Sequence, residues 1–101
     1  MIMPKKADQA MQELHRRWQA IFSLLASGGE VSPGLRLRTE GMMETLALLD
    51  LYSIEQLQQE MAACYSSCES RPLPPDWSEL FPFPQIPGFG QRAPVYPSTS
   101  D

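Results

Sequence analysis

The chain has 101 residues, 43% of them hydrophobic, and carries a net charge of −4 with a pI near 4.9. This length allows one domain, whose modest stability would gain from a dimer contact or a bound partner. The acidic balance excludes a broad basic surface for phosphate neutralisation, so we expect no direct nucleic-acid binding. No apolar run reaches the roughly 18 residues of a membrane span, and the N-terminus lacks the apolar core of a signal peptide. We therefore expect a cytoplasmic protein without membrane contact.

An amphipathic helix is predicted over residues 5–26. Apolar residues recur there at intervals of three and four, which is the spacing of one stripe along an α-helix. The stripe consists of Ala7, Met11, Leu14, Trp18, Ile21 and Leu25. Gly28 and Gly29 follow and are expected to end the helix, because glycine adopts left-handed backbone without a steric penalty. We interpret the basic residues at 15–17 as a solvated face with Trp18 turned inward, the alternative being an anion contact.

A second helix is predicted over residues 35–51, with Ser32 and Pro33 as an alternative start. It is apolar around more than half of its circumference, so we expect it to be the central helix or to carry an interface. Gly41 in its middle indicates a close helix crossing, a bend or simple tolerance. The candidate partner-binding residues on this helix are Met42, Met43, Leu48 and Leu51.

The third helix is predicted over residues 54–67, and its start is the clearest local signal in the chain. Ser53 and Gln56 have the spacing of a capping box, in which the hydroxyl accepts an N–H of the new helix and the amide reaches back to the cap. Because the preceding helix is predicted to run to residue 51, almost no loop is expected between the two. The apolar stripe of this helix consists of Ile54, Leu57, Met61, Cys64 and Cys68.

Cys64 and Cys68 are the only cysteines, and their spacing of four places them one above the other on a helical face. We interpret them as small apolar residues on a packed face in a reducing compartment, because free cysteine is among the most buried residue types. A metal site and an intermolecular disulfide or redox role are the alternatives. A closed zinc shell needs more ligands and the chain has one histidine, so we predict no metal and no cofactor.

Residues 71–101 form a proline- and aromatic-rich extension that excludes long helices and central strands. Asp76 and Glu79 repeat the capping-box spacing and predict one helical turn at 77–81. The extension is expected to wrap back over the helices, to dock on another subunit or partner, or to remain a flexible tail. Its candidate partner-binding residues are Trp77, Phe81, Phe83, Phe89 and Tyr96.

These patterns predict an all-α fold: a small three-helix bundle over residues 1–70 followed by the proline- and aromatic-rich extended segment over 71–101. No phosphate-binding loop, nucleophile arrangement or other catalytic signature is present, so we expect no enzyme. A small acidic helical chain with methionine- and leucine-rich faces instead favours an interaction protein, expected as a homodimer.

In outline, residues 7–68 resemble the small bacterial antiactivators of the QslA-like, quorum-sensing type, which are short helical chains without a DNA-binding element of their own. The resemblance implies a protein that sequesters a transcriptional regulator by covering one of its surfaces. It carries over no role for any single residue. The alternatives are a structural or chaperone-like subunit of a larger assembly and a metal- or redox-responsive protein that uses Cys64 and Cys68.

Overall fold

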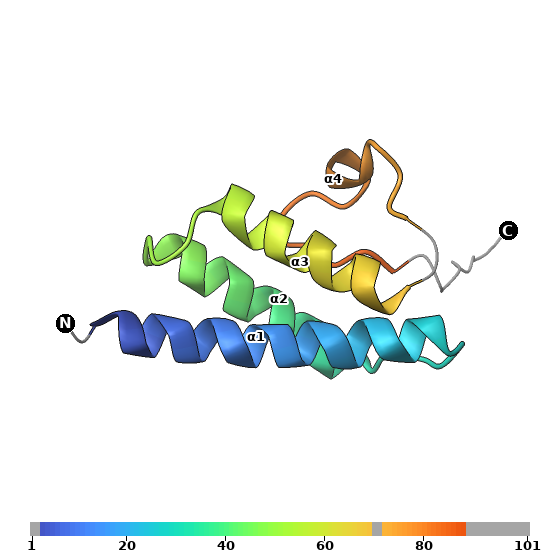
Figure 1. The fold of residues 1–101 in the computed structure, drawn as a ribbon, viewed down its shortest axis with the longest axis horizontal. Coiled ribbons are helices and arrows are strands. Elements are labelled where there is room, and N and C mark those ends of the chain that lie inside the picture. Colours follow the sequence, from blue (N-terminus) through green and yellow to red (C-terminus); the bar gives the residue numbers. More distant parts are fainter. Residues whose placement is uncertain (1–2, 70–71, 89–101) are drawn as a thin grey trace, which may run out of the picture.

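The computed structural model describes residues 3–69 and 72–88, apart from the side chains of residues 3–5. The described residues form helices and connections without a strand, so the predicted all-α bundle is confirmed (Figure 1). The helices are α1 (Met3–Ala26), α2 (Pro33–Leu48), α3 (Ile54–Cys68) and α4 (Trp77–Leu80). Within the described residues, no helix is long and apolar enough to cross a membrane.

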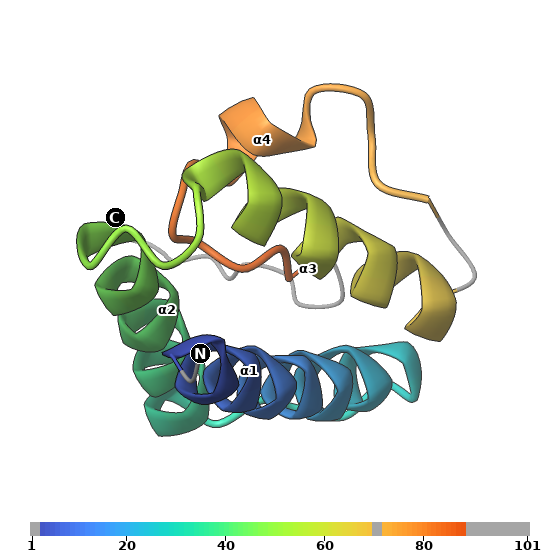
Figure 2. The same cartoon turned by 60° about the vertical axis from the view of Figure 1, so that its left-hand side comes forward.

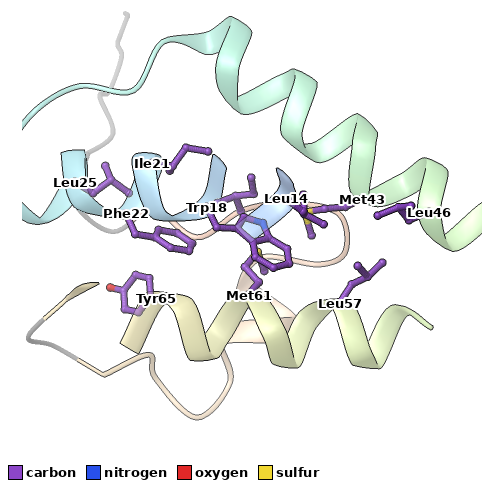
Figure 3. Packing of buried hydrophobic residues seen from close by; sticks show 11 residues of the cluster. Leu14, Trp18, Ile21, Phe22, Leu25, Met43, Leu46, Leu57, Met61 and Tyr65 are labelled. Atoms are coloured by element: carbon purple, nitrogen blue, oxygen red, sulfur yellow. The ribbon is translucent and has the colours of Figure 1, made fainter. Parts of the chain in front are cut away.

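The central helix is α1, which packs against both α2 and α3. Its predicted apolar stripe faces inward, and Leu14 and Trp18 are fully buried between the other two helices (Figure 3). The core cluster consists of Leu14, Trp18, Ile21, Phe22, Leu25, Met43, Leu46, Leu57, Met61, Tyr65 and Ile86. Of the two alternatives for the second helix, the central position is therefore not the observed one, because only some of the apolar residues of α2 are buried: Met43 and Leu46 are in the core, whereas Leu37 and Leu48 are exposed. Gly41 on α2 is exposed and has open space where a Cβ would lie, which excludes a close helix crossing as the reason for glycine there.

α2 begins two residues before the predicted residue 35. The Ser32 hydroxyl accepts a hydrogen bond from the Leu35 N–H at 3.1 Å, and Pro33 occupies the first turn, where its missing N–H costs nothing. The alternative start is thus the observed one. The predicted end at residue 51 is wrong, since the helix stops at Leu48.

The early end of α2 is caused by a left-handed residue, Asp50, with φ of 59°. Its N–H donates to the Ala47 carbonyl at 3.0 Å, and the Leu51 N–H donates to the Leu46 carbonyl at 3.1 Å. This pair of bonds is a Schellman motif, which satisfies the last carbonyls of the helix and reverses the chain. Residues 49–53 therefore form a real connection, contrary to the prediction of almost no loop.

The predicted start of α3 is confirmed. The Ser53 hydroxyl accepts a hydrogen bond from the Gln56 N–H at 3.0 Å, and Ser53 has the extended backbone of an N-cap. Within the described part of the chain, the Gln56 amide makes no return hydrogen bond, so only one half of the capping box is formed. α3 ends at Cys68, one residue beyond the predicted bound.

Asp50→Gly is expected to raise the free energy of unfolding by about 1 kcal/mol, because glycine removes the penalty that a Cβ imposes on left-handed backbone. The end of α1 supplies the comparison: Gly28, with φ of 83°, occupies the same position of a Schellman motif there. Gly28→Ala should lower the free energy of unfolding by a similar amount. Urea denaturation of both variants measures this, and an unchanged Asp50→Gly midpoint would contradict the assigned backbone strain.

α4 is a single turn on the side of α3 that faces away from α1 (Figures 1 and 2). The predicted turn at 77–81 is present as Trp77–Leu80, but the predicted capping by Asp76 and Glu79 is wrong. The Asp76 side chain makes no capping hydrogen bond, and its φ and ψ of −99° and 26° are not those of an extended N-cap. Instead, its backbone carbonyl accepts the Glu79 N–H at 3.0 Å.

Residues 81–88, here called the strap, run back from α4 between α2 and α3 (Figure 2). Ile86 and Pro87 are buried, and Ile86 belongs to the core cluster. The strap is fixed to α2 by two hydrogen bonds: Arg36 Nη2 donates to the Ile86 carbonyl at 2.9 Å, and the Ile86 N–H donates to Glu40 Oε2 at 3.0 Å. Of the three expectations for the extension, wrapping back over the helices describes residues 72–88. The hydrophobic core thus continues past the compositional boundary at residue 70.

Candidate partner-binding surface

Four large apolar side chains are exposed where α2 turns into α3. Leu48 is 76% exposed, Leu49 62%, Leu51 47% and Ile54 44%. We call these four residues the corner patch. Isolated apolar residues on a surface need no explanation, but a group of large ones at a single turn is typical of an interaction site.

A hollow of about 290 Å³ adjoins the corner patch. Its walls come from three elements: the last turns of α2, the start of α3, and the strap. The residues that line it are Glu44, Ala47, Leu48, Ile54, Phe83 and Pro84. The hollow is mostly apolar, and Glu44 places a carboxylate at its edge.

The backbone of the turn explains why Leu49 and Leu51 are not part of the core. The Schellman motif stops α2 after Leu48, so Leu49 and Leu51 lie in the turn and leave the inward-facing stripe that ends with Leu46. The turn is anchored to α1 by Tyr52, whose hydroxyl donates to the Ala7 carbonyl at 3.2 Å. Burial raises the pKa of Tyr52, and the nearby carboxylates of Asp8 and Glu60 add to this shift. The corner patch therefore sits on a fixed turn.

The predicted site residues divide between surface and interior. Leu48 and Leu51 lie in the corner patch, and Phe83 reaches the hollow. Met43 is fully buried against α1, so it belongs to the core and we withdraw it from the contact surface. The half-buried residues are Met42, Trp77, Phe81 and Phe83. Phe89 and Tyr96 lie outside the described residues.

Sequence reasoning missed Leu49, Ile54 and Pro84 as members of this surface. The inner stripe predicted for the third helix includes Ile54, yet this residue is 44% exposed at the first position of α3. A usable signal was Asp50 between two leucines, since aspartate tolerates left-handed backbone and can mark a helix end.

The corner patch lies in an acidic part of the chain. Residues 39–69 contain no Lys, Arg or His, and their carboxylates are Glu40, Glu44, Asp50, Glu55, Glu60 and Glu69. Glu40 pairs with Arg36 and Glu60 with His15. Within the described part of the chain, Glu44, Asp50 and Glu55 form no ion pair, and all three are exposed. The exposed charge in and beside the patch is therefore negative.

The basic residues at 15–17 all lie next to acidic side chains of the same chain. Both Arg16 and Arg17 pair with Glu13, and His15 Nε2 lies 2.8 Å from Glu60 Oε1 of α3. The hydrogen bond from Arg17 is the main cause that lowers the pKa of Glu13. Trp18 is fully buried, so the interpretation of this cluster as a surface beside an inward tryptophan is confirmed for Trp18.

Cys64 and Cys68 are both half-buried free thiols on α3, and the Ser23 hydroxyl of α1 lies 3.8 Å from the Cys68 sulfur. Burial raises the pKa of Cys64 to about 11, with smaller contributions from the charge and the hydrogen bond of Cys68. The thiolate is the form that reacts and binds metals, so Cys64 is held in its unreactive form at neutral pH. Among the described residues, no group of three or more His, Cys, Asp or Glu side chains is placed to hold a metal ion.

The free energy of unfolding is expected to fall as the pH rises from about 9 to about 11. In this window the unfolded chain has released the Cys64 proton while the folded chain still holds it. Cys64→Ala should make this decline less steep. Part of the decline should remain, because the raised pKa of Tyr52 acts in the same direction. Urea midpoints at several pH values measure the slope, and equal slopes for the wild type and Cys64→Ala would refute the assignment.

Comparison with protein-family models, with curated protein sequences and with solved structures gave no match for this chain.

Proposed function

We propose that this chain is a non-enzymatic regulator that binds another protein through the corner patch and its hollow. The observation that carries the proposal is the exposure of four large apolar side chains at one fixed turn, next to an apolar hollow. Leu48 and Ile54 belong to the patch and also line the hollow, and Leu48 is the central contact because it is the more exposed of the two, at 76% against 44%. A few residues near the centre of an interface usually carry most of its binding energy, and Leu48 has that place here.

We further propose that the partner is a transcriptional regulator and that binding sequesters it in the cytoplasm, as in the quorum-sensing antiactivators. Supporting features are the small acidic helical fold and the absence of a basic recognition helix among the described residues: α3 carries Glu55 and Glu60 and no Lys or Arg. The homodimer stays a prediction. Sedimentation velocity of the purified full chain over a range of concentrations tests it.

The proposed function is tested by affinity capture from the native source with mass-spectrometric identification. The wild-type chain should retain a specific protein, and Leu48→Asp should lose it. Leu37→Asp is the matched control, because Leu37 is also on α2 and is 65% exposed but lies outside the corner patch. Retention of the same proteins by wild type and Leu48→Asp would rule out the proposed contact.

A permanent subunit of a larger assembly could use the same surface. The burial of eleven hydrophobic residues in one cluster favours a regulator that folds alone. A cooperative thermal transition of the isolated chain is expected for the regulator. Aggregation without a transition would favour the obligate subunit.

A further inference from the structure

We propose that the occupant of the corner patch and its hollow is a basic amphipathic α-helix of the partner protein, an inference that rests on the proposed function. The shape of the site, its charge and the elements around it all favour this occupant.

The shape favours side chains over a free small molecule. Ligand pockets for small molecules usually have volumes of about 300 to 1,000 Å³ and enclose most of the ligand. The hollow, of about 290 Å³, is just below this range, and Leu49 and Leu51 of the adjoining turn are exposed. It therefore suits one or two large apolar side chains, with the exposed leucines covering the rest of an apolar stripe.

The charge favours a basic ligand. Glu44 lines the hollow, Asp50 lies between Leu49 and Leu51, and Glu55 follows Ile54. Residues 39–69, which contain Glu44 and the whole corner patch, carry no Lys, Arg or His. Lysines and arginines flanking an apolar stripe would meet unpaired carboxylates, which raises the association rate and selects against acidic partners.

The same carboxylates argue against a second copy of this chain as the occupant. A two-fold symmetric contact brings each surface against its own equivalent. Glu44, Asp50 and Glu55 would then face the same three residues of the other copy. Like charges placed opposite one another weaken such a contact.

The form of the ligand follows from the elements around the site. An extended peptide that adds to a sheet needs a free strand edge, and the described residues contain no strand. A polyproline ligand needs an aromatic-lined groove, whereas Phe83 is the one aromatic residue that lines this hollow. Aliphatic walls from two helix ends match the remaining mode, in which a helix lays apolar residues at spacings of three and four into a groove.

The test is a fluorescence-anisotropy titration of the full chain with three synthetic peptides of about 18 residues. The first has a leucine stripe flanked by lysines and arginines. The second has the same stripe flanked by glutamates, and the third is the basic peptide with its stripe scrambled. We expect the first to bind at least about tenfold more tightly than the other two, with an affinity that falls as salt rises from about 50 to about 300 mM.

Three variants locate the contact. Leu48→Asp should weaken binding of the basic stripe peptide by about tenfold or more, and Glu44→Lys by about threefold or more. Leu37→Asp should change it by less than about twofold. Circular dichroism melts check that all three fold, as expected for substitutions at exposed positions.

The inference is overturned if the acidic peptide binds as tightly as the basic one, or if the scrambled peptide does. It is also overturned if Leu37→Asp weakens binding as much as Leu48→Asp, or if the full chain alone forms a dimer that Leu48→Asp dissociates. Loss of a native partner by Leu48→Asp, together with preference for the acidic peptide, would leave the proposed function standing. Failure of the wild-type chain to retain any native protein would instead count against the proposed function.

Discussion

Trp18→Ala is expected to lower the free energy of unfolding by about 3 to 5 kcal/mol, the usual cost of removing a buried aromatic side chain. Trp18 is fully buried at the centre of α1, and its ring lies edge-on to that of His15 with 5.3 Å between the ring centroids. Since the free energy of unfolding of a small domain is about 5 to 15 kcal/mol in total, the variant should be close to unfolding at physiological temperature. Thermal melts should show a midpoint lowered by roughly 15 to 30 °C.

Gln19→Ala is the control for this prediction, because Gln19 is the next residue of α1 and is exposed. Its midpoint should stay within a few degrees of the wild type, since alanine is also a good helix former. A Trp18→Ala midpoint equally close to the wild type would show that α1 is not the centre of the core.

Ile86→Ala is expected to lower the free energy of unfolding by about 2 to 4 kcal/mol, although it lies in a proline-rich segment without a helix. Ile86 is 1% exposed, and its backbone N–H and carbonyl are both bonded to α2 through Glu40 and Arg36. The truncation would leave a cavity in the core, which the proline-restricted strap cannot easily close. Urea denaturation followed by tryptophan fluorescence measures the loss.

Leu80→Ala is the matched control in the same segment, because Leu80 is 52% exposed on α4. It should change the free energy of unfolding by less than about 1 kcal/mol. Equal, small effects of Ile86→Ala and Leu80→Ala would mean that the strap contributes little to the folded core.

Local signals in the sequence were sufficient to predict the three long helices. The stripe of α1 and the Ser53 cap of α3 depend on residues three or four positions apart, so they can be identified without knowledge of the tertiary fold. The end of α2 was missed because Asp50, and not glycine, adopts the left-handed conformation. Sequence patterns favour glycine at that position, so aspartate gave only a weak signal.

The candidate surface depends on tertiary contacts that the sequence does not encode locally. Met43 and Leu48 are both apolar residues of α2, yet one is fully buried and the other is 76% exposed. This difference in exposure depends on which side of α2 packs against α1. The path of the strap is likewise set by distant partners, since Ile86 is bonded to residues 46 and 50 positions earlier in the chain. No periodicity could have revealed that pairing.

An amide NMR titration of the ¹⁵N-labelled full chain, with its bound partner or with the basic stripe peptide, tests most directly whether the corner patch is the binding surface. The predicted result is a set of shift changes concentrated at residues 44–54 and at Phe83, the backbone around the hollow. Changes concentrated instead around Leu37 or along the exposed side of α1, with residues 44–54 unaffected, would contradict it.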